Sequence, residues 1–281
     1  MIEKKIDIYA EEFIRIDLNS VELICEAGDN YAILAVSDIS GKKIIACEYF
    51  EFDTLNNNWN NIFNEIKVSS KILTNDYNSC RLFYNFPEVL VVPALYDNAE
   101  NAKIYLNTFY GTLKNSTVEI DRLQAFDNVS VVYSVEEEHK LVVQNNLKPS
   151  SVHHSYSKLL QNISQVQNSN EKCLHLFFYN QMMVAVLINN SQLQFIKSVK
   201  YLSFDDVLYF ILNIAKQYGV STEQLQLKVS GFINPDSDEF MVLQKYFLHI
   251  VLEEPHETIF FSEIFKGFPK QYFTPFFYLL A

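Results

Sequence analysis

Two segments of the chain have the same arrangement of apolar runs and turns. Residues 21–52 and 173–204 each contain three short apolar runs that are separated by two polar turns. Alternating and β-branched apolar residues favour strands, and Gly, Asn and Asp supply the backbone angles that tight hairpins need. Each segment therefore predicts a three-stranded meander, and a helix pattern follows each one. A chain that contains this unit twice is restricted to a fold with two similar mixed sheets.

Superposing Phe52 on Phe204 aligns the two segments. The aligned apolar pairs are Ile24 with Leu176, Ala32 with Val184, Leu34 with Val186, Ile44 with Ile196, Tyr49 with Tyr201, and Ile62 with Ile214. Each half then has the order β-β-β-α-β-α, followed by a further strand. We expect an α/β fold in which two related domains face each other across a cleft, and an internal duplication as its origin.

Further elements are predicted along both halves. We expect helices over residues 55–66, 97–110, 136–147, 153–163, 204–218 and 238–247, and strands near Tyr84 and over 89–92, 129–133, 225–229 and 258–261. Asp97 is expected to cap the second helix, and Ser203 with Asp206 forms a capping box. Residues 1–19 form an irregular lead-in or a first strand. The polar stretch SQVQNSNEK predicts a boundary between domains 1–165 and 166–281.

Charge and composition restrict the partners of the chain. It has 281 residues, a formal net charge of −12 and a pI near 5.0, which disfavours nucleic acid and anionic membrane surfaces. No apolar run approaches the roughly 20 residues of a membrane span, so we expect no membrane insertion. The four cysteines form no Cys-x-x-Cys pair, and the first residues lack an apolar leader. The sequence thus predicts a reduced, cytoplasmic protein.

Three stretches carry a resemblance to a known family. They are FPEVLVVPALYDNAENAKIYLN, VHHSYSKLLQNI, and SFDDVLYFILNIAKQYGV followed by LKVSGFI. With them the chain resembles domain of unknown function 3822, a family of uncharacterised bacterial proteins. The resemblance implies the actin-like ATPase (ASKHA, RNase H-like) fold of actin, the 70-kilodalton chaperones, sugar kinases and pilus-assembly relatives. It also implies a candidate site for ATP and magnesium between the domains.

The first hairpin only partly matches the phosphate motif that the resemblance implies. Active members have Asp-x-Gly-Ser/Thr, in which the acid holds a metal-bound water and the hydroxyl donates to phosphate. This chain has Glu26-Ala27-Gly28-Asp29. The carboxylate of Asp29 stands in place of the hydroxyl and would repel a phosphate. The favoured interpretation is a plain hairpin turn over residues 26–30.

The other two loops match less well. The second hairpin has Asn180 where an acid and a glycine are expected, and the adenosine loop has Ser230-Gly231-Phe232 with one glycine of two. The cleft-facing candidates are therefore Glu26, Gly28, Asp29, Asn180, Ser230 and Gly231. We expect no catalytic residue, no metal ligand and no cofactor, with ATP and magnesium as the disfavoured alternative.

Other chemistry is weakly supported by the sequence. Cys173 and His175 share a strand face, and buried packing is favoured over a zinc site. His256-Glu257 lacks the second histidine of a zinc-protease helix. The aromatic C-terminal segment is expected to pack on the second domain. We expect a non-catalytic interaction or scaffold module, a pseudoenzyme with an unknown protein partner. The alternative is a nucleotide- or small-ligand-binding switch that keeps a functional interdomain cleft.

Overall fold

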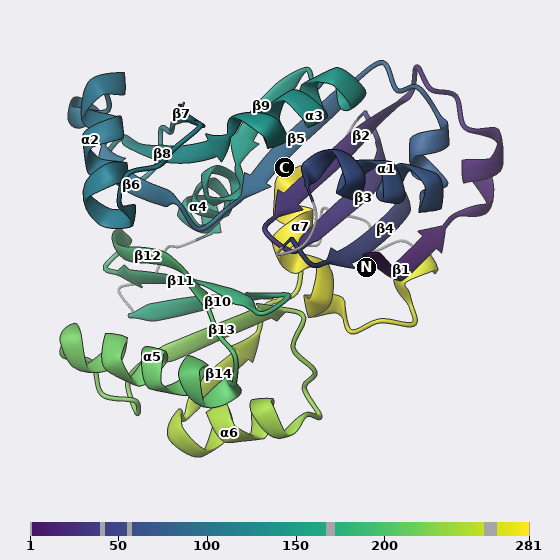
Figure 1. The fold of residues 1–281 in the computed structure, drawn as a ribbon. Helices are drawn as coiled ribbons and strands as arrows, with labels where there is room; N and C mark the ends of the chain where they lie inside the picture. The colour runs from purple at the N-terminus through teal and green to yellow at the C-terminus, as the bar shows by residue number, and fades with distance from the viewer. Residues whose placement is uncertain (1, 40–42, 55–57, 167–171, 256–262, 281) are drawn as a thin grey trace. The chain divides into compact units, whose positions relative to one another are not determined.

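The chain folds into two compact units. The computed structural model describes residues 2–39, 43–54, 58–166, 172–255 and 263–280. Unit 1 comprises the described residues up to Gln161 together with 263–267 and 279–280, and unit 2 comprises 162–255 and 268–278 (Figure 1). The division after Gln161 precedes the predicted one by a few residues. The last residues of the chain contribute to both units.

Unit 1 is built on a six-stranded sheet with the order β1-β4-β3-β2-β5-β9. Its strands are β1 (Ile2–Tyr9), β2 (Val21–Gly28), β3 (Tyr31–Asp38), β4 (Ile44–Phe52), β5 (Cys80–Asn85) and β9 (Ser151–His154). The neighbours from β1 to β2 are antiparallel, whereas β2-β5 and β5-β9 are parallel.

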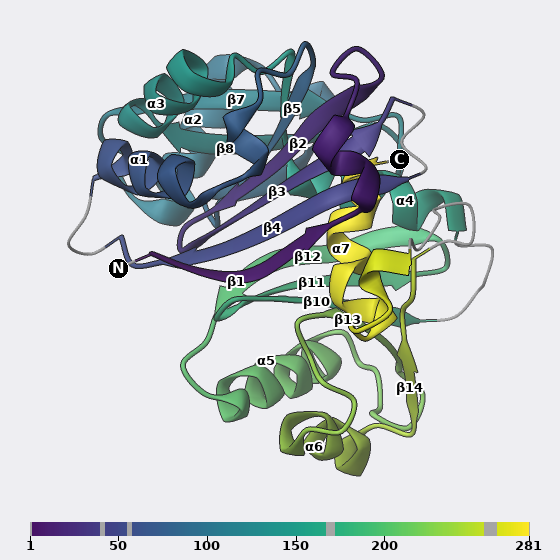
Figure 2. The ribbon, with the colours of Figure 1, turned by 90° about the vertical axis from the view of Figure 1, so that its right-hand side faces the viewer.

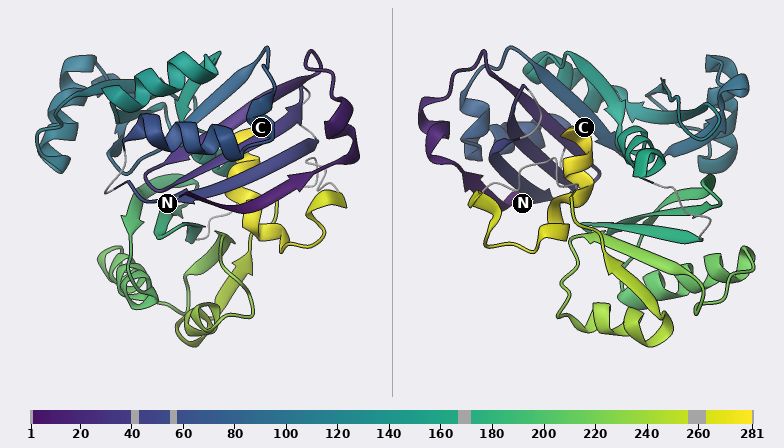
Figure 3. Two further views of the ribbon diagram at one scale, coloured as in Figure 1. Left: turned by 45° about the vertical axis from the view of Figure 1, so that its right-hand side comes forward. Right: turned by 180° about the vertical axis from the view of Figure 1, so that it is seen from behind.

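Helices cover both faces of this sheet. On one face lie α1 (Trp59–Ser69) and α3 (Glu137–Leu147) (Figures 2 and 3). These helices enclose a small apolar space with Cys25, Leu34 and Leu82. On the opposite face lies α4 (Ser155–Val166). Among the described residues, no helix has the length and apolar character that crossing a bilayer requires.

A small insertion separates β5 from α3. It contains β6 (Val89–Pro93), α2 (Ala99–Tyr110), β7 (Ser116–Arg122) and β8 (Val129–Glu136), with the antiparallel order β6-β8-β7. The strand β7 was not predicted from the sequence. The predicted cap of α2 is also wrong, because Asn98 accepts from the N–H of Asn101 at 2.9 Å. Asp97 instead pairs with Arg122 at 2.8 Å and accepts from Ser130 at 2.7 Å, which ties the start of α2 to the sheet.

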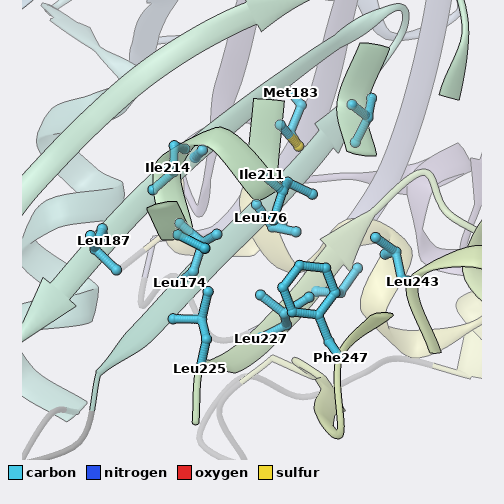
Figure 4. Close-up of a cluster of buried hydrophobic side chains, with 14 of the residues drawn as sticks. Leu174, Leu176, Met183, Leu187, Ile211, Ile214, Leu225, Leu227, Leu243 and Phe247 are labelled. Atoms are coloured by element: carbon cyan, nitrogen blue, oxygen red, sulfur yellow. The ribbon is translucent and has the colours of Figure 1, made fainter. Parts of the chain in front are cut away.

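Unit 2 is built on a five-stranded sheet with the order β12-β11-β10-β13-β14. Its strands are β10 (Cys173–Tyr179), β11 (Met182–Asn189), β12 (Gln192–Lys200), β13 (Gln226–Gly231) and β14 (His249–Leu252). Helices α5 (Phe204–Gln217) and α6 (Asp238–Tyr246) bury leucine, isoleucine and phenylalanine side chains against it (Figure 4). The predicted capping box of Ser203 and Asp206 begins α5.

The two sheets have the same topology. In unit 1 the order β4-β3-β2-β5-β9 has the same strand directions as β12-β11-β10-β13-β14 in unit 2. Unit 1 adds β1 at one edge and the insertion between β5 and α3. The predicted α/β fold with two related β-β-β-α-β-α sheets is confirmed.

The residue alignment predicted between the halves is wrong by one position in the first two strands and by three in the third. Phe52 ends β4, whereas Phe204 begins α5. Leu34 faces the helices of unit 1, but in unit 2 Ala185 and Leu187, rather than Val186, lie in the helix-side core. Side chains alternate along a strand, so a shift of one residue exchanges the two faces. The connection from β11 to β12, between Asn189 and Gln192, is shorter than that from β3 to β4, between Asp38 and Ile44, and the apolar pattern did not reveal this difference.

Several boundaries also differ from the prediction. His153 and His154 lie in β9, and α4 begins only at Ser155, because β9 pairs with β5. The strand β14 was missed, and the predicted strand over 258–261 lies outside the described residues. Helix α1 begins at Trp59 after the Asn58 cap.

The aromatic C-terminal segment packs as predicted. The 3-10 turn Lys270–Phe273 and the short helix α7 (Thr274–Phe277) contact β13 of unit 2, and Phe273, Phe276 and Phe277 are buried.

Candidate functional site

Glu26 is a buried carboxyl group in β2. The predicted turn over 26–30 is wrong, because parallel pairing with β5 continues the strand as far as Gly28. The Glu26 side chain is 0% exposed, and its Oε1 accepts from the Ser155 hydroxyl at 2.5 Å. Its Oε2 has no hydrogen-bond partner among the described residues. Burial raises the pKa of Glu26 to about 8, and the hydrogen bond from Ser155 lowers it only in part.

Gly28 makes room for an aromatic ring. A Cβ atom at Gly28 would lie 2.2 Å from Cε1 of Tyr31. Tyr31 is buried, and its hydroxyl accepts from Nδ2 of Asn85 at 2.7 Å, which fixes the ring in place. In nucleotide-binding members this glycine lets backbone N–H groups reach a phosphate. Here the tyrosine ring covers the residue.

Asp29 lies at a pocket within unit 1. The pocket has a volume of about 590 Å³ and lies among the first hairpin, α1, the insertion and the start of α3. Its carboxylates come from Asp29, Glu88, Glu136 and Glu138, and the one basic residue among its described lining is Lys114. Of these carboxylates, only Asp29 was predicted from the sequence as a site residue. The others come from the insertion and from α3, whose proximity no local pattern predicts.

Aromatic rings form another part of this pocket. The Trp59 indole N–H donates to Glu136 at 2.9 Å, and the Trp59 ring lies edge-on to those of His139 and Phe86, at centroid distances of 4.3 and 6.1 Å. Burial lowers the pKa of His139 to about 3, so this imidazole is neutral near pH 7. Aromatic faces beside carboxylates bind ammonium and guanidinium groups well. We call these lining residues the acidic pocket.

The second hairpin is a tight turn. Asn180 and Gln181 connect Tyr179 to Met182, which are paired, and Gln181 has φ 52°. Asn180 is half-buried. A two-residue turn without glycine exposes few backbone N–H groups, so it cannot surround a phosphate in the manner of a phosphate loop.

Ser230 and Gly231 end β13 next to β10. Gly231 has φ 86°, and a Cβ atom there would lie 2.0 Å from the carbonyl oxygen of Phe178. That oxygen accepts from the N–H of Phe232 at 2.9 Å. Ser230 is 0% exposed, and its hydroxyl has no partner among the described residues. The glycine is therefore required by the close approach of two strands.

A second pocket lies beside Gly231 within unit 2. It has a volume of about 480 Å³, and its described lining includes the aromatic residues Phe178, Tyr201, Phe204, Phe232 and Tyr272. The one charged residue in that lining is Glu239. The pocket thus offers rings for stacking but no cation for a phosphate.

Cys173 and His175 are both buried in β10. Nδ1 of His175 lies 3.1 Å from Oε2 of Glu253. Burial opposes the imidazolium, but attraction to Glu253 and hydrogen bonds with Glu253 and Cys173 outweigh it and raise the pKa of His175 to about 9. The pair is an internal ion pair of unit 2. No group of three His, Cys, Asp or Glu side chains in the described chain is placed to hold a metal, and His256 lies outside it.

Two solved structures illustrate the similarity of this chain to known folds. One is a protein from Bacteroides thetaiotaomicron with an actin-like ATPase fold and unknown function, 14% identical, with a TM-score of 0.73, covering 84% of this chain and 92% of its own. Another is the PilM-PilN type IV pilus biogenesis complex, 11% identical, with a TM-score of 0.59, covering 92% and 96%. These similarities show the fold. A search of curated proteins finds no match.

A family model covers most of the sequence. The model described as protein of unknown function (DUF3822) matches residues 10–250, which include the strands from β2 to β13 and the insertion. The match agrees with the shared topology of the two units and with the actin-like neighbours. The chain therefore belongs to the DUF3822 family and has an actin-like ATPase fold.

Proposed function

We propose that this chain is a protein-binding module that uses the actin-like fold without nucleotide chemistry. The observation that supports this most is the covering of two glycines at the positions of the phosphate and adenosine loops. Gly28 is packed against the Tyr31 ring, and Gly231 is packed against the backbone of Phe178. The residues present do not fit ATP and magnesium well, because Glu26, which stands where the fold's metal-binding acid is expected, is buried and bonded to Ser155.

The same fold occurs in a protein–protein complex. The PilM-PilN structure is a complex of type IV pilus biogenesis, and its fold matches nearly the whole of this chain. This likeness supports a role in binding another protein.

We place the partner at the acidic pocket of unit 1. Four carboxylates surround a volume of about 590 Å³ and outnumber the single Lys114 of its described lining. The Trp59 ring is held by its bond to Glu136, so an aromatic surface is already in position for a cation. A partner segment with a lysine or arginine side chain matches this lining in charge and shape.

The alternative function is a nucleotide- or small-ligand-binding switch. The aromatic pocket beside Gly231 favours it, because rings such as Phe232 can stack on a base. Against it, the described lining of that pocket has no basic side chain, and the first hairpin is closed by Tyr31. A triphosphate bound in this pocket would have no basic side chain of the described lining to balance its negative charge.

Charge reversal within α3 tests the role of the acidic pocket. Glu138 lines the pocket, while its neighbour Glu137 is equally exposed and is absent from the lining. We expect displayed random peptides selected on the full chain to be enriched in lysine or arginine. Glu138→Lys should weaken such a peptide at least about tenfold because it adds a like charge.

Glu137→Lys is the matched control, since it makes the same change in the first turn of the same helix. Its peptide affinity should stay within about twofold of the wild type. Fluorescence anisotropy measures both variants. Enrichment of peptides without basic residues, or equal losses in the two variants, would contradict the pocket assignment.

A further inference from the structure

Strand β1 occupies the outer edge of the unit 1 sheet. It pairs antiparallel with β4, from Ile2 opposite Phe52 to Tyr9 opposite Ala46 (Figure 2). In unit 2 the strand that corresponds to β4 is β12, because each is the third strand of its meander. Unit 2 has no described strand that corresponds to β1. No other strand of the described chain pairs with the outer edge of β12. One sheet edge is thus covered and its counterpart is open.

The open edge is long and accessible. β12 has nine residues, and Gln192, Lys197 and Lys200 are exposed. Near its start a bulge lies at Gln194, whose carbonyl accepts from the Tyr218 hydroxyl at 3.1 Å. The residues after the bulge follow a regular register with β11. An edge strand of this length is a template for another extended segment.

The charges at the two edges are opposite. In unit 1, Tyr31 and Leu34 of β3 lie opposite Glu51 and Glu48 of β4. The residues at the same steps of β11, Met182 and Ala185, lie opposite Lys200 and Lys197 of β12. Two acidic positions of the covered edge are therefore basic at the open edge.

Strand β1 places two lysines diagonal to the acids of β4, while Glu3 and Asp7 lie directly opposite Glu51 and Glu48. Nζ of Lys4 lies 3.3 Å from Oε1 of Glu48, and Nζ of Lys5 lies 3.9 Å from Oε2 of Glu51. Cross-strand pairs of opposite charge stabilise a sheet, and like charges destabilise it. A strand that pairs with β12 in the same register therefore matches Lys200 and Lys197 with acids at the places of Glu3 and Asp7, and it needs acids in place of the diagonal lysines Lys4 and Lys5.

We propose that β12 binds an extended acidic segment of a partner protein, which adds as an antiparallel strand in the place that β1 takes on β4. A second copy of the chain is a poorer occupant, because β12 against β12 would bring Lys197 and Lys200 of both copies together. Lysines at a sheet edge are also a known means of preventing such self-pairing. This surface lies in unit 2, so the inference is independent of the acidic pocket in unit 1.

Two peptides derived from β1 test this inference on the full chain. One has the sequence of Ile2–Tyr9, IEKKIDIY, and the other has glutamate at its third and fourth positions, IEEEIDIY. Isothermal titration should show that the glutamate peptide binds at least about tenfold more tightly than the lysine peptide. Methylating alternate backbone nitrogens on one edge of the peptide should abolish binding, and methylating the other edge should not, because a strand pairs through one edge only.

Variants of the chain assign the site. Lys197→Glu should reverse the preference between the two peptides, whereas Lys216→Glu, an exposed change in the last turn of α5, should leave it unchanged. Sedimentation of the chain without peptide should give the same oligomeric state for the wild type and for Lys197→Glu. No saturable binding of the glutamate peptide at about 1 mM, equal binding by Lys197→Glu, or a β12-dependent dimer would each overturn the proposal.

Discussion

Replacing Gly231 with alanine is expected to destabilise unit 2 by about 3 kcal/mol or more. Two effects add at this position. The φ of 86° is unfavourable for a residue with a Cβ atom, and that atom would lie 2.0 Å from the carbonyl oxygen of Phe178 and 2.7 Å from its nitrogen. Backbone atoms of β10 cannot move away without breaking the parallel pairing with β13. A loss of this size shifts the unfolding of a domain by roughly 10 °C.

Two other glycines provide matched controls for this prediction. Gly219 has φ 61° and nothing within 4 Å of a Cβ atom, so Gly219→Ala should cost about 1 kcal/mol for the backbone angle alone. Gly267 has neither constraint, and Gly267→Ala should lie within about 0.5 kcal/mol of the wild type. Urea unfolding monitored by hydrogen exchange in β10 and β13 measures the series. Equal stability of Gly231→Ala and Gly219→Ala would show that the strands do not meet as closely as described.

Replacing Glu26 with glutamine is expected to flatten the pH dependence of the stability of unit 1. Glu26 has its pKa raised from 4.5 to about 8 by burial, so between these values the folded state keeps a proton that the unfolded state has lost. The free energy of unfolding therefore falls as pH rises through this range, by up to about 1.4 kcal/mol per pH unit. Glutamine stays neutral and can still accept from Ser155, so Glu26→Gln should be the more stable protein at pH 8, by on the order of 3 kcal/mol.

Glu48 is the control for this change. It is also 0% exposed, but its carboxylate accepts from the Ser70 hydroxyl at 2.5 Å and from the Lys71 N–H at 2.9 Å, and it pairs with Lys4. Glu48→Gln should therefore lower stability, by about 2 kcal/mol, instead of raising it at high pH. Urea midpoints for unit 1 between pH 5 and pH 9 compare the two variants. A parallel decline of wild type and Glu26→Gln with pH would contradict an ionising carboxyl in this core.

Much of the fold is predictable from the sequence because the signals are local. The two meanders, the capping box at Ser203 and the apolar stripe of α5 each arise within a short stretch. The strands β7, β9 and β14 were missed because their residues are only partly buried and lack a strong apolar pattern. Their assignment depends on pairing with distant strands.

The candidate sites were less predictable. The sequence predicted Gly28 and Gly231 as site residues. It could not show whether the space beside each glycine is available to a phosphate or is filled by other parts of the protein. That distinction depends on Tyr31 and Phe178, whose positions are tertiary. The acidic pocket was missed for the same reason, since Trp59, Glu88 and Glu138 come from three separate elements. Its charge pattern exists only in the folded unit.

Calorimetric titration of the full chain with ATP and magnesium tests the central claim most directly. Because Tyr31 covers Gly28 and Phe178 meets Gly231, we expect no saturable heat of binding up to about 1 mM and no release of phosphate. Saturable one-to-one binding in the micromolar range, weakened at least about tenfold by Gly28→Ala or Glu26→Gln, would contradict the claim that the protein's own side chains and backbone fill these positions.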